Sequence, residues 1–263
     1  MTTTDLQNTT EPSSPITTNP PRTKPAPVTQ PPVTTAPPRD LSNVTGPVVA
    51  LTFDDGPKAA STQALLDVLV ENHSTASFFM VGKTIDRTGG SMGSRTLQTL
   101  FQNILAAGCT IECHSMTHEL LTEGKTAEQL RDEYLSVSRK IQSICGYEPL
   151  FFRPPWLQTN NMVYDNIPLT FIGGGSGGVA DWDASTPVED IANRIRRDAV
   201  DGQILLLHDT ANVVEALRIV LPELCAAGYT FVNVAELFEI KGKSLTSDPD
   251  TAEHRQMWSN LAR

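Results

Sequence analysis

The feature that most constrains this chain is an alternation, from Pro47 onward, between short apolar runs and segments whose apolar residues recur at helical spacing. Seven of the apolar runs are interpreted as strands, at residues 48–53, 75–82, 109–113, 150–152, 169–172, 203–207 and 229–234. Several runs are almost entirely apolar, which is typical of parallel strands covered on both faces. The helical segments between them supply that cover. The alternation therefore predicts an α/β fold with about seven parallel strands.

Two capping-box patterns predict where helices start. Thr126 is followed three positions later by Gln129, and Thr186 is followed in the same way by Glu189. Pro187 is expected at the first helical position of the second helix, where a missing N–H costs nothing.

Polar residues follow the carboxyl ends of most of the predicted strands. Two aspartates follow the first run, HSMTH the third, RPPW the fourth, GGGSGGVADWD the fifth and HD the sixth. In a barrel the carboxyl ends of parallel strands meet on one rim, where catalytic groups lie. We therefore expect a barrel in preference to an open sheet, with all these groups on the same rim.

Residues 1–44 differ in composition from the rest of the chain. The first forty residues hold ten of the 19 prolines and eleven threonines, and they contain no aromatic residue and no cysteine. Such a stretch buries too little apolar surface to offset the entropy lost on ordering. We interpret residues 1–44 as a disordered Thr/Pro-rich linker that tethers the folded domain to another module, although a disordered terminus without function also fits. Residues 45–240 are expected to form the domain and residues 241–263 a C-terminal extension.

Charge and hydropathy exclude several classes of partner. The formal net charge of -10 argues against nucleic acid, because phosphate binding needs lysine and arginine gathered on one face. No apolar run has the length of a transmembrane span or a signal peptide. We expect a secreted monomer that binds no membrane and whose signal segment lies outside this sequence.

The four cysteines, Cys109, Cys113, Cys145 and Cys225, allow three full disulfide pairings, and no rule of spacing selects one. Cys109 and Cys113 are four residues apart, so on a strand their side chains point the same way. Small buried residues are the favoured interpretation of these two.

Two adjacent carboxylates end the first apolar run, in the stretch VVALTFDDGP. Asp, Gly and Pro favour turns, so a turn at the end of a buried strand explains the stretch. Alternatively, the strand delivers Asp54 and Asp55 to the rim for use in chemistry. His114 and His118 favour the second explanation, because four-residue spacing on a helical turn places both imidazoles on one face. Two histidines with one carboxylate form a ligand set expected of catalytic zinc and of several other divalent ions.

The motifs TFDDGP, HSMTH, RPPW, DW and LLLHD, in this order and at these separations, resemble those of the polysaccharide deacetylases with a NodB-type domain, the family-4 carbohydrate esterases. The resemblance covers about Pro47 to Leu237. It implies a distorted (β/α)7 barrel over residues 45–240. It also implies a metal-dependent hydrolase that removes acetyl groups from a polysaccharide, with zinc as the expected cofactor and cobalt, manganese or nickel as alternatives.

The same resemblance implies a role for the charged motif residues. It makes Asp55, His114 and His118 the metal ligands and Asp54 the general base. A metal beside Asp55 lets two neighbouring carboxylates stay ionised together, and it lowers the pKa of bound water. His208 matches the general acid that protonates the leaving group, although a histidine at a strand end can also be structural.

Further matches concern the surroundings of the acid and the base. Arg153 matches the arginine that holds the base, and Asp181 matches the aspartate that orients the acid; ordinary ion pairs are the alternative. The backbone N–H of Trp156 is expected to hold the oxyanion. Trp156 and Trp182 are expected to stack on sugar rings, and Leu206 to border the acetyl methyl group, unless these residues only cover or fill the core.

Two features depart from the family pattern. Leu157 stands where many members have glycine, and GGGSGGVA precedes the DW motif in place of a common Asp-containing strand end. Both are expected to reshape the substrate groove without touching the metal. The glycine-rich run lacks the Lys-Ser/Thr that completes a phosphate-binding loop, so that function is rejected.

Acetylxylan, with its O-acetyl esters, is the first choice of substrate, because a Thr/Pro linker is typical of modular plant-cell-wall enzymes. Chitin oligomers or peptidoglycan, with N-acetyl amides, are the alternatives. An aspartyl-phosphate phosphatase needs one spacer between its two aspartates, which are adjacent here. An inactive sugar-binding module of the same fold would lack the base or the acid, yet Asp54 and His208 are both present.

Overall fold

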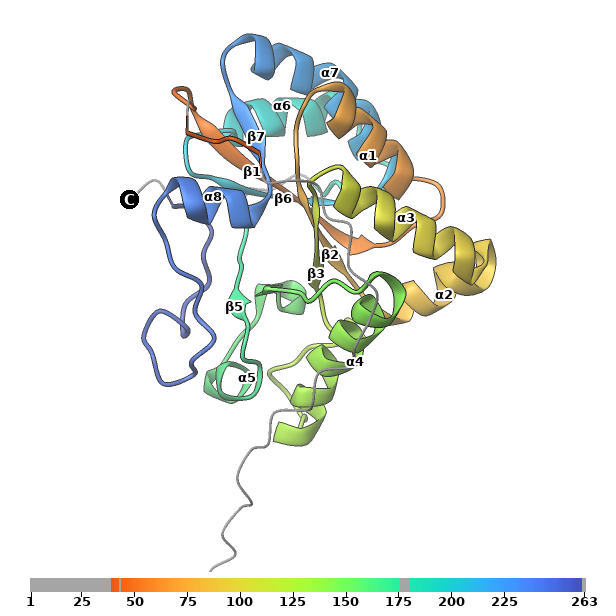
Figure 1. The fold of residues 1–263 in the computed structure, drawn as a ribbon, viewed down its shortest axis with the longest axis vertical. Helices are drawn as coiled ribbons and strands as arrows, with labels where there is room; N and C mark the ends of the chain where they lie inside the picture. The colour runs from red at the N-terminus through yellow and green to blue at the C-terminus, as the bar shows by residue number, and fades with distance from the viewer. Residues whose placement is uncertain (1–38, 43, 176–179, 262–263) are drawn as a thin grey trace, which may run out of the picture. The chain divides into compact units, whose positions relative to one another are not determined.

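The computed structural model describes residues 39–42, 44–175 and 180–261. A sheet of seven strands lies at its centre, and every strand pairing in it is parallel (Figure 1): β1 (Val48–Gly56), β2 (Ser77–Met80), β3 (Thr110–Cys113), β4 (Phe151–Phe152), β5 (Thr170–Phe171), β6 (Ile204–His208) and β7 (Thr230–Val232). The strand order is β5-β4-β3-β2-β1-β6, with β7 paired to β1. Each of the seven predicted runs overlaps one of these strands, so the α/β prediction is confirmed.

The end strands β5 and β6 are joined through a segment near the C-terminus, residues 257–261. Trp258 N donates to Phe171 O at 3.0 Å on the β5 side, and Ile204 N donates to Ser259 O at 3.0 Å on the β6 side. The curled sheet and this segment together form a distorted (β/α)7 barrel, as the resemblance implied. Part of the predicted C-terminal extension therefore packs into the seam of the barrel.

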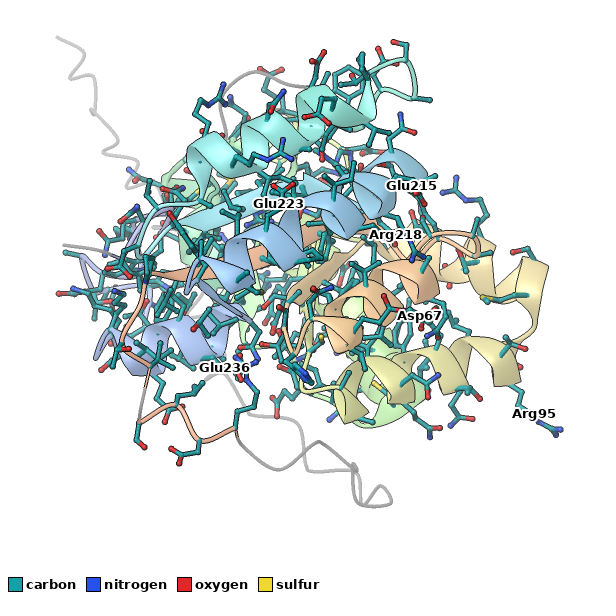
Figure 2. The ribbon with its side chains drawn as sticks, turned by 90° about the horizontal axis from the view of Figure 1, so that it is seen from above. Asp67, Arg95, Glu215, Arg218, Glu223 and Glu236 are labelled. Carbon is teal, nitrogen blue, oxygen red and sulfur yellow. The ribbon has the colours of Figure 1, made fainter. Side chains whose placement is uncertain are left out.

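Helices cover the outside of the sheet. In the described ranges they are α1 (Thr62–Glu71), α2 (Gly82–Met92), α3 (Ser94–Ala106), α4 (Ala127–Cys145), α5 (Asn161–Asn166), α6 (Val188–Asp198), α7 (Ala211–Ala226), α8 (Val234–Ile240) and the 3₁₀ turn η1 (Pro155–Leu157). Leu65 and Leu69 of α1 are fully buried, whereas Asp67 of α1, Arg95 of α3 and Glu215 of α7 lie on outer faces (Figure 2). None of the described helices has the length and apolar character that crossing a bilayer requires.

The two predicted helix starts differ in outcome. Thr126 Oγ1 accepts from Gln129 N and Gln129 Oε1 accepts from Thr126 N, which confirms the first capping box at the start of α4. The second prediction is wrong: Pro187 is the N-cap of α6, and no side chain caps this helix. The hydroxyl of Thr186 instead donates to Ala180 O at 2.6 Å. A tertiary contact has therefore taken the hydroxyl that the local pattern assigned to the helix.

Side chains along β1 alternate between two apolar clusters. Val49, Leu51 and Phe53 pack outward with the surrounding helices, whereas Val48 and Ala50 belong to a cluster inside the barrel that also holds side chains of α8. The inward positions nearer the carboxyl end of β1 are polar. The barrel interior is thus apolar at one end and polar at the other.

The four cysteines carry free thiols. Cys109 and Cys113 are buried in the outer cluster, which confirms the prediction made for these two. Burial raises the pKa of the Cys109 thiol to about 12, so this thiol stays protonated at neutral pH.

Described residues of the predicted linker contact the domain. Arg39 Nε donates to Glu236 Oε1 at 2.9 Å, and Arg39 Nη1 donates to His73 O at 2.8 Å. Val44 packs against the inner cluster. Among the residues that the structure describes, contacts with the domain therefore begin at Arg39, several residues before the predicted boundary.

Candidate active site

The candidate site lies on the inner face of the barrel at the carboxyl ends of the strands. Asp54 of β1 is paired with His208 of β6 in the sheet register. His114 directly follows β3, and Arg153 directly follows β4. Since parallel strands place their carboxyl ends on one rim, four motifs that are distant in sequence converge here.

Asp55 joins Asp54 at this rim because β1 is irregular. Asp54 pairs with Phe79 of β2 and Gly56 pairs with the next residue of β2, so Asp55 is an extra residue in β1. Its φ of 68° lies in the left-handed region, as in a β-bulge. Adjacent side chains of a regular strand point to opposite faces. Here an oxygen of Asp54 and one of Asp55 lie 3.6 and 3.7 Å from His114 Nε2.

Asp55, His114 and His118 offer donor atoms that all lie within 4.8 Å of one another. His118 Nε2 is 3.2 Å from Asp55 Oδ1. His114 Nδ1 donates to Arg153 O at 2.7 Å, which leaves Nε2 of this ring free for ligation. Burial lowers the pKa of His114 and so favours the neutral form that binds metal. Two imidazoles and one carboxylate fit zinc or a similar divalent ion.

The helical turn predicted between the two histidines is wrong. Ser115 has a φ of 65° and His118 a φ of 60°, so this segment is a loop. The two imidazoles nevertheless converge, with ring centroids 4.9 Å apart. Asp55, Trp156 and Leu157 also have positive φ values; four of these five residues belong to the motifs at this rim, and Leu157 directly follows one of them. Strained backbone of this kind gathers at functional sites, where surrounding structure holds it in place.

Arg153 lies behind Asp54 and is fully buried. Its Nη1 donates to Asp54 Oδ1 at 2.6 Å and to Thr52 Oγ1 at 2.8 Å, and its Nη2 donates to Gly173 O at 2.6 Å. The guanidinium carbon lies 4.2 Å from the centre of the Phe79 ring. These contacts fix one carboxylate oxygen of Asp54 and leave Oδ2 facing His114.

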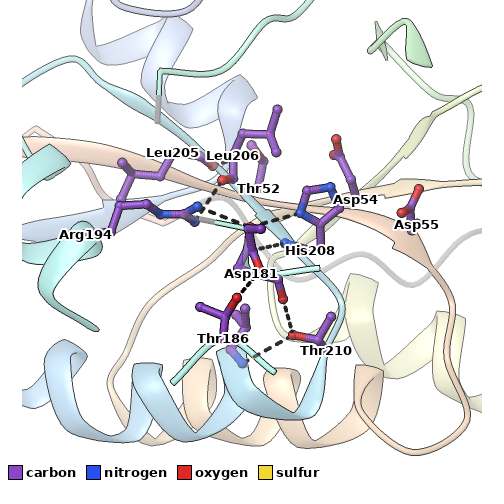
Figure 3. A network of polar contacts seen from close by, with 12 residues as sticks. Thr52, Asp54, Asp55, Asp181, Thr186, Arg194, Leu205, Leu206, His208 and Thr210 are labelled. Carbon is purple, nitrogen blue, oxygen red and sulfur yellow. Dashed lines mark hydrogen bonds and ion pairs between the residues drawn. The ribbon is translucent and has the colours of Figure 1, made fainter. Parts of the chain in front are cut away.

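His208 is held by a buried ion-pair network (Figure 3). Asp181 Oδ2 accepts from His208 N at 2.7 Å, and Asp181 Oδ1 lies 3.2 Å from both His208 Nδ1 and Arg194 Nη1. Burial lowers the pKa of His208, but the hydrogen bond to Asp181 and the charges of Asp54, Asp181 and Asp55 outweigh it and raise this pKa overall. Burial raises the pKa of Asp181, but its bonds to His208 and the charge of Arg194 lower it overall.

Sequence reasoning missed Arg194 in this network. The sequence does contain a signal that could have identified it, because this arginine falls on the apolar face of α6 beside Ile191 and Ile195, both of which are buried. A buried arginine is rare unless it is paired.

A pocket of about 720 Å³ joins these groups. Nine of the ten predicted site residues line it, and the tenth, Arg153, supports it from behind. Trp156 and Trp182 also line it and are 67% and 63% exposed, so their ring faces are open to a ligand. Leu206 and Leu157 form further parts of the wall.

The start of the glycine-rich run packs against β6. A Cβ added at Gly174 would lie 2.4 Å from Leu206 Cβ, and one at Gly175 would lie 1.8 Å from Gln203 Nε2. These glycines therefore permit a close approach of backbone to side chain. Residues 176–179 of the same run lie outside the described residues.

Residues 42–168 match the family model for polysaccharide deacetylase. The chain is 36% identical over 217 residues to a bifunctional xylanase/deacetylase of Pseudobutyrivibrio xylanivorans, and the aligned region covers 81% of this chain and 33% of that protein. It is 34% identical over 202 residues to a peptidoglycan-N-acetylglucosamine deacetylase of Bacillus cereus, covering 74% of this chain and 89% of that protein. The chain thus spans about a third of the first relative and most of the second.

Two solved structures share the fold over 82% of this chain. The Xyl-CE4 domain of a multidomain xylanase from the hindgut metagenome of Trinervitermes trinervoides gives a TM-score of 0.71 at 35% identity, with 98% of that chain covered. A family 4 acetyl xylan esterase from Clostridium thermocellum, solved in complex with a cobalt ion, gives 0.72 at 32% identity, with 100% covered. Given these similarities and the order of its motifs, the chain belongs to the polysaccharide deacetylase family, the family-4 carbohydrate esterases.

Proposed function

We propose that this domain is a metal-dependent esterase that removes O-acetyl groups from xylan. The observation that carries the hydrolytic chemistry is the convergence of Asp55, His114 and His118 on one point, with Asp54 beside them and His208 on the same pocket. The choice of xylan is supported by two of the relatives, a bifunctional xylanase/deacetylase and a domain of a multidomain xylanase. The domain is proposed to be a secreted monomer that its Thr/Pro-rich linker tethers to another module. Such a modular arrangement agrees with xylan as the substrate.

Asp55, His114 and His118 would hold the metal. A bound divalent ion would acidify a water molecule and polarise the acetyl carbonyl. Zinc is the proposed ion, with cobalt, manganese and nickel as candidates to be compared with it. Arg153 holds Asp54 Oδ1, so Oδ2 of Asp54 is the oxygen that accepts the proton from the attacking water.

His208 acts as the general acid. Its Nδ1 is bonded to Asp181, so Nε2 is the nitrogen that carries the proton into the pocket. The raised pKa of His208 favours the protonated ring that a general acid needs. The proton goes to the departing sugar oxygen, or to nitrogen in an amide substrate, as the bond to the acetyl carbon breaks.

The remaining pocket residues bind the sugar and the acetyl group. Trp156 and Trp182 present exposed rings that suit the C–H faces of a pyranose. Leu206 borders the acetyl methyl group, and the N–H of Trp156 donates to the oxyanion. Leu157, which replaces the glycine of many members, narrows the groove beside Trp156.

N-deacetylation of peptidoglycan is the second candidate. It is supported by the 34% identity to the peptidoglycan-N-acetylglucosamine deacetylase over nearly all of that protein. The two candidates share the metal, base and acid. They differ in the leaving group, which is an alcohol for an O-acetyl ester and an amine for an N-acetyl amide. An amine departs less readily than an alcohol and depends more on protonation by His208.

Acetate release tests both candidates. The enzyme is assayed on acetylated xylan, chitin oligomers and peptidoglycan, before and after chelation and after each metal is returned. We expect release from acetylxylan to exceed the others and to disappear on chelation. Release that survives thorough chelation contradicts the metal mechanism, and faster release from peptidoglycan overturns the choice of xylan.

Two variants separate the roles of the adjacent aspartates. Asp55→Ala should lose metal affinity, and excess metal should partly restore its activity. Asp54→Asn should bind metal normally but lose about 10²- to 10⁴-fold in kcat, with no rescue by metal. Asp67→Asn, on the outer face of α1, controls for loss of a carboxylate. Full activity of Asp54→Asn would support the turn explanation of this stretch.

A further inference from the structure

A buried carboxylate outside the family motifs contacts the loop between the two histidine ligands. Glu133, in the middle of α4, is 5% exposed. Its Oε2 accepts from Met116 N and Thr117 N, both at 3.0 Å. Its Oε1 accepts from Thr117 Oγ1 and Lys125 Nζ, both at 2.8 Å. One side chain thus binds two successive backbone N–H groups of this loop.

The loop needs such support because its backbone is strained. Ser115 and His118 both have left-handed φ values, which are unfavourable for residues other than glycine. From the other side, Gly82 N and Lys83 N, at the start of α2, donate to the carbonyls of Ser115 and Met116 at 3.0 and 2.8 Å. Two carbonyls of the loop are therefore held by α2, and two of its N–H groups are held by Glu133; the N–H of His118 donates to Ser115 Oγ at 2.9 Å.

The two histidines depend on this loop to different degrees. His114 is 3% exposed and its ring is oriented by the carbonyl of Arg153. The side chain of His118 is 28% exposed, and its recorded ring contacts are with Asp55, His114 and Trp156. Backbone placement therefore does more to orient His118 than to orient His114.

We propose that Glu133 is a positioning residue that sets the metal affinity of this site by holding the 115–118 loop with His118 turned toward Asp55. The inference rests on the metal site of the proposed function and adds a residue that touches neither metal nor substrate. A buried anion suits this place because backbone N–H groups and Lys125 surround it, and charge-assisted hydrogen bonds are stronger than neutral ones. Outer partners that orient ligands commonly change metal affinity by about 10- to 100-fold.

Glu133→Gln tests the proposal with little change of shape. The amide keeps one oxygen for the loop, but it loses the charge and turns an NH2 group toward Thr117 or Lys125. We expect the dissociation constant for zinc, measured by competition with a chromogenic chelator, to rise about tenfold or more. Activity at saturating zinc should return to near the wild-type value, because bound metal restores the position of His118.

Glu119→Gln is the matched control. Glu119 also bonds Lys125, at 2.9 Å, but its side chain is 59% exposed and accepts no backbone N–H of the loop. This control should leave the zinc dissociation constant within about twofold of wild type. If Glu133→Gln does not fold without metal, Thr117→Val removes the hydroxyl contact to Glu133, together with a 3.3 Å hydrogen bond from Glu119 N, and should weaken zinc binding in the same direction.

The outcomes separate this inference from the proposed function. A melting temperature that falls in metal-free Glu133→Gln while the zinc dissociation constant stays at the control value would make Glu133 a structural residue and overturn the proposal. The same holds if Thr117→Val, used as the substitute, binds zinc as wild type does. Tight zinc binding by the wild type without acetate release from any substrate would instead overturn the proposed function, and the affinity comparison would still stand.

Discussion

A second buried glutamate, Glu112 of β3, should make the free energy of unfolding depend on pH. Glu112 is fully buried. Its Oε2 accepts from Leu150 N and Phe151 N at 2.8 and 2.9 Å, and its Oε1 accepts from Tyr147 Oη at 3.1 Å. Burial raises its pKa from an ordinary 4.5 to about 7, although these hydrogen bonds oppose the shift. Glu112→Gln keeps an oxygen for the two N–H groups and removes the charge.

The sign and size of the effect follow from that pKa. Below pH 4.5 the carboxyl is protonated in the folded and the unfolded chain. Between pH 4.5 and about 7 the unfolded chain loses this proton first, so the free energy of unfolding falls as pH rises. Each pKa unit is worth about 1.4 kcal/mol, which amounts to about 3 kcal/mol across this range. The Gln variant lacks this loss, so its stability relative to wild type should rise by about 3 kcal/mol from pH 4.5 to pH 8.

Chemical denaturation of the metal-free proteins at several pH values measures this difference. Comparing variant with wild type at each pH cancels the titration of other groups. A gain of 3 kcal/mol corresponds to about 6 to 12 °C in melting temperature for a domain of this size. Glu215→Gln, which removes an exposed carboxylate of α7, should show a far smaller change with pH. If the difference between Glu112→Gln and wild type is constant from pH 4.5 to 8, Glu112 does not have a raised pKa and the reasoning is refuted.

Two further predictions concern the acid and the linker. Asp181→Asn removes the charge that raises the pKa of His208 and weakens the hydrogen bond to its ring, so the alkaline limb of the kcat profile should move to lower pH. An unmoved limb contradicts the assignment of His208 as the acid. Deleting residues 1–38 should leave the melting temperature unchanged. Deleting residues 1–44 also removes Arg39 and its bonds to the domain, so the free energy of unfolding should fall by about 1–2 kcal/mol. Equal melting temperatures of the two deletion variants would show that those bonds contribute nothing to stability.

The strands were predictable because each one satisfies a local requirement. A parallel strand covered on both faces needs a nearly continuous apolar run, and no other feature of the chain produces such runs at this spacing. The start of α4 was predictable for a similar reason, because a capping box needs only residues three positions apart. The predicted site residues lie near the carboxyl ends of strands or in the loops that follow them, so knowing the strands was enough to expect them on one rim.

Helix α2 shows where local rules fail. It contains Gly89 and Gly90, which disfavour a helix, and the sequence did not predict it. In the structure the bare backbone of Gly89 allows α3 to pack closely, since a Cβ there would lie 3.1 Å from Leu97 Cδ2. A packing contact has outweighed the low intrinsic propensity.

By itself the sequence determined the fold class, the order of the motifs and the chemical types of the site residues, because these depend on composition and on short spacings. Only the tertiary structure decided how the site is assembled. The bulge that turns Asp55 toward His114 depends on pairing with β2, and the loop that presents His118 depends on a carboxylate of α4. Arg194 likewise completes the histidine network from α6. Contacts between distant segments fix these orientations, and no local pattern of residues encodes them.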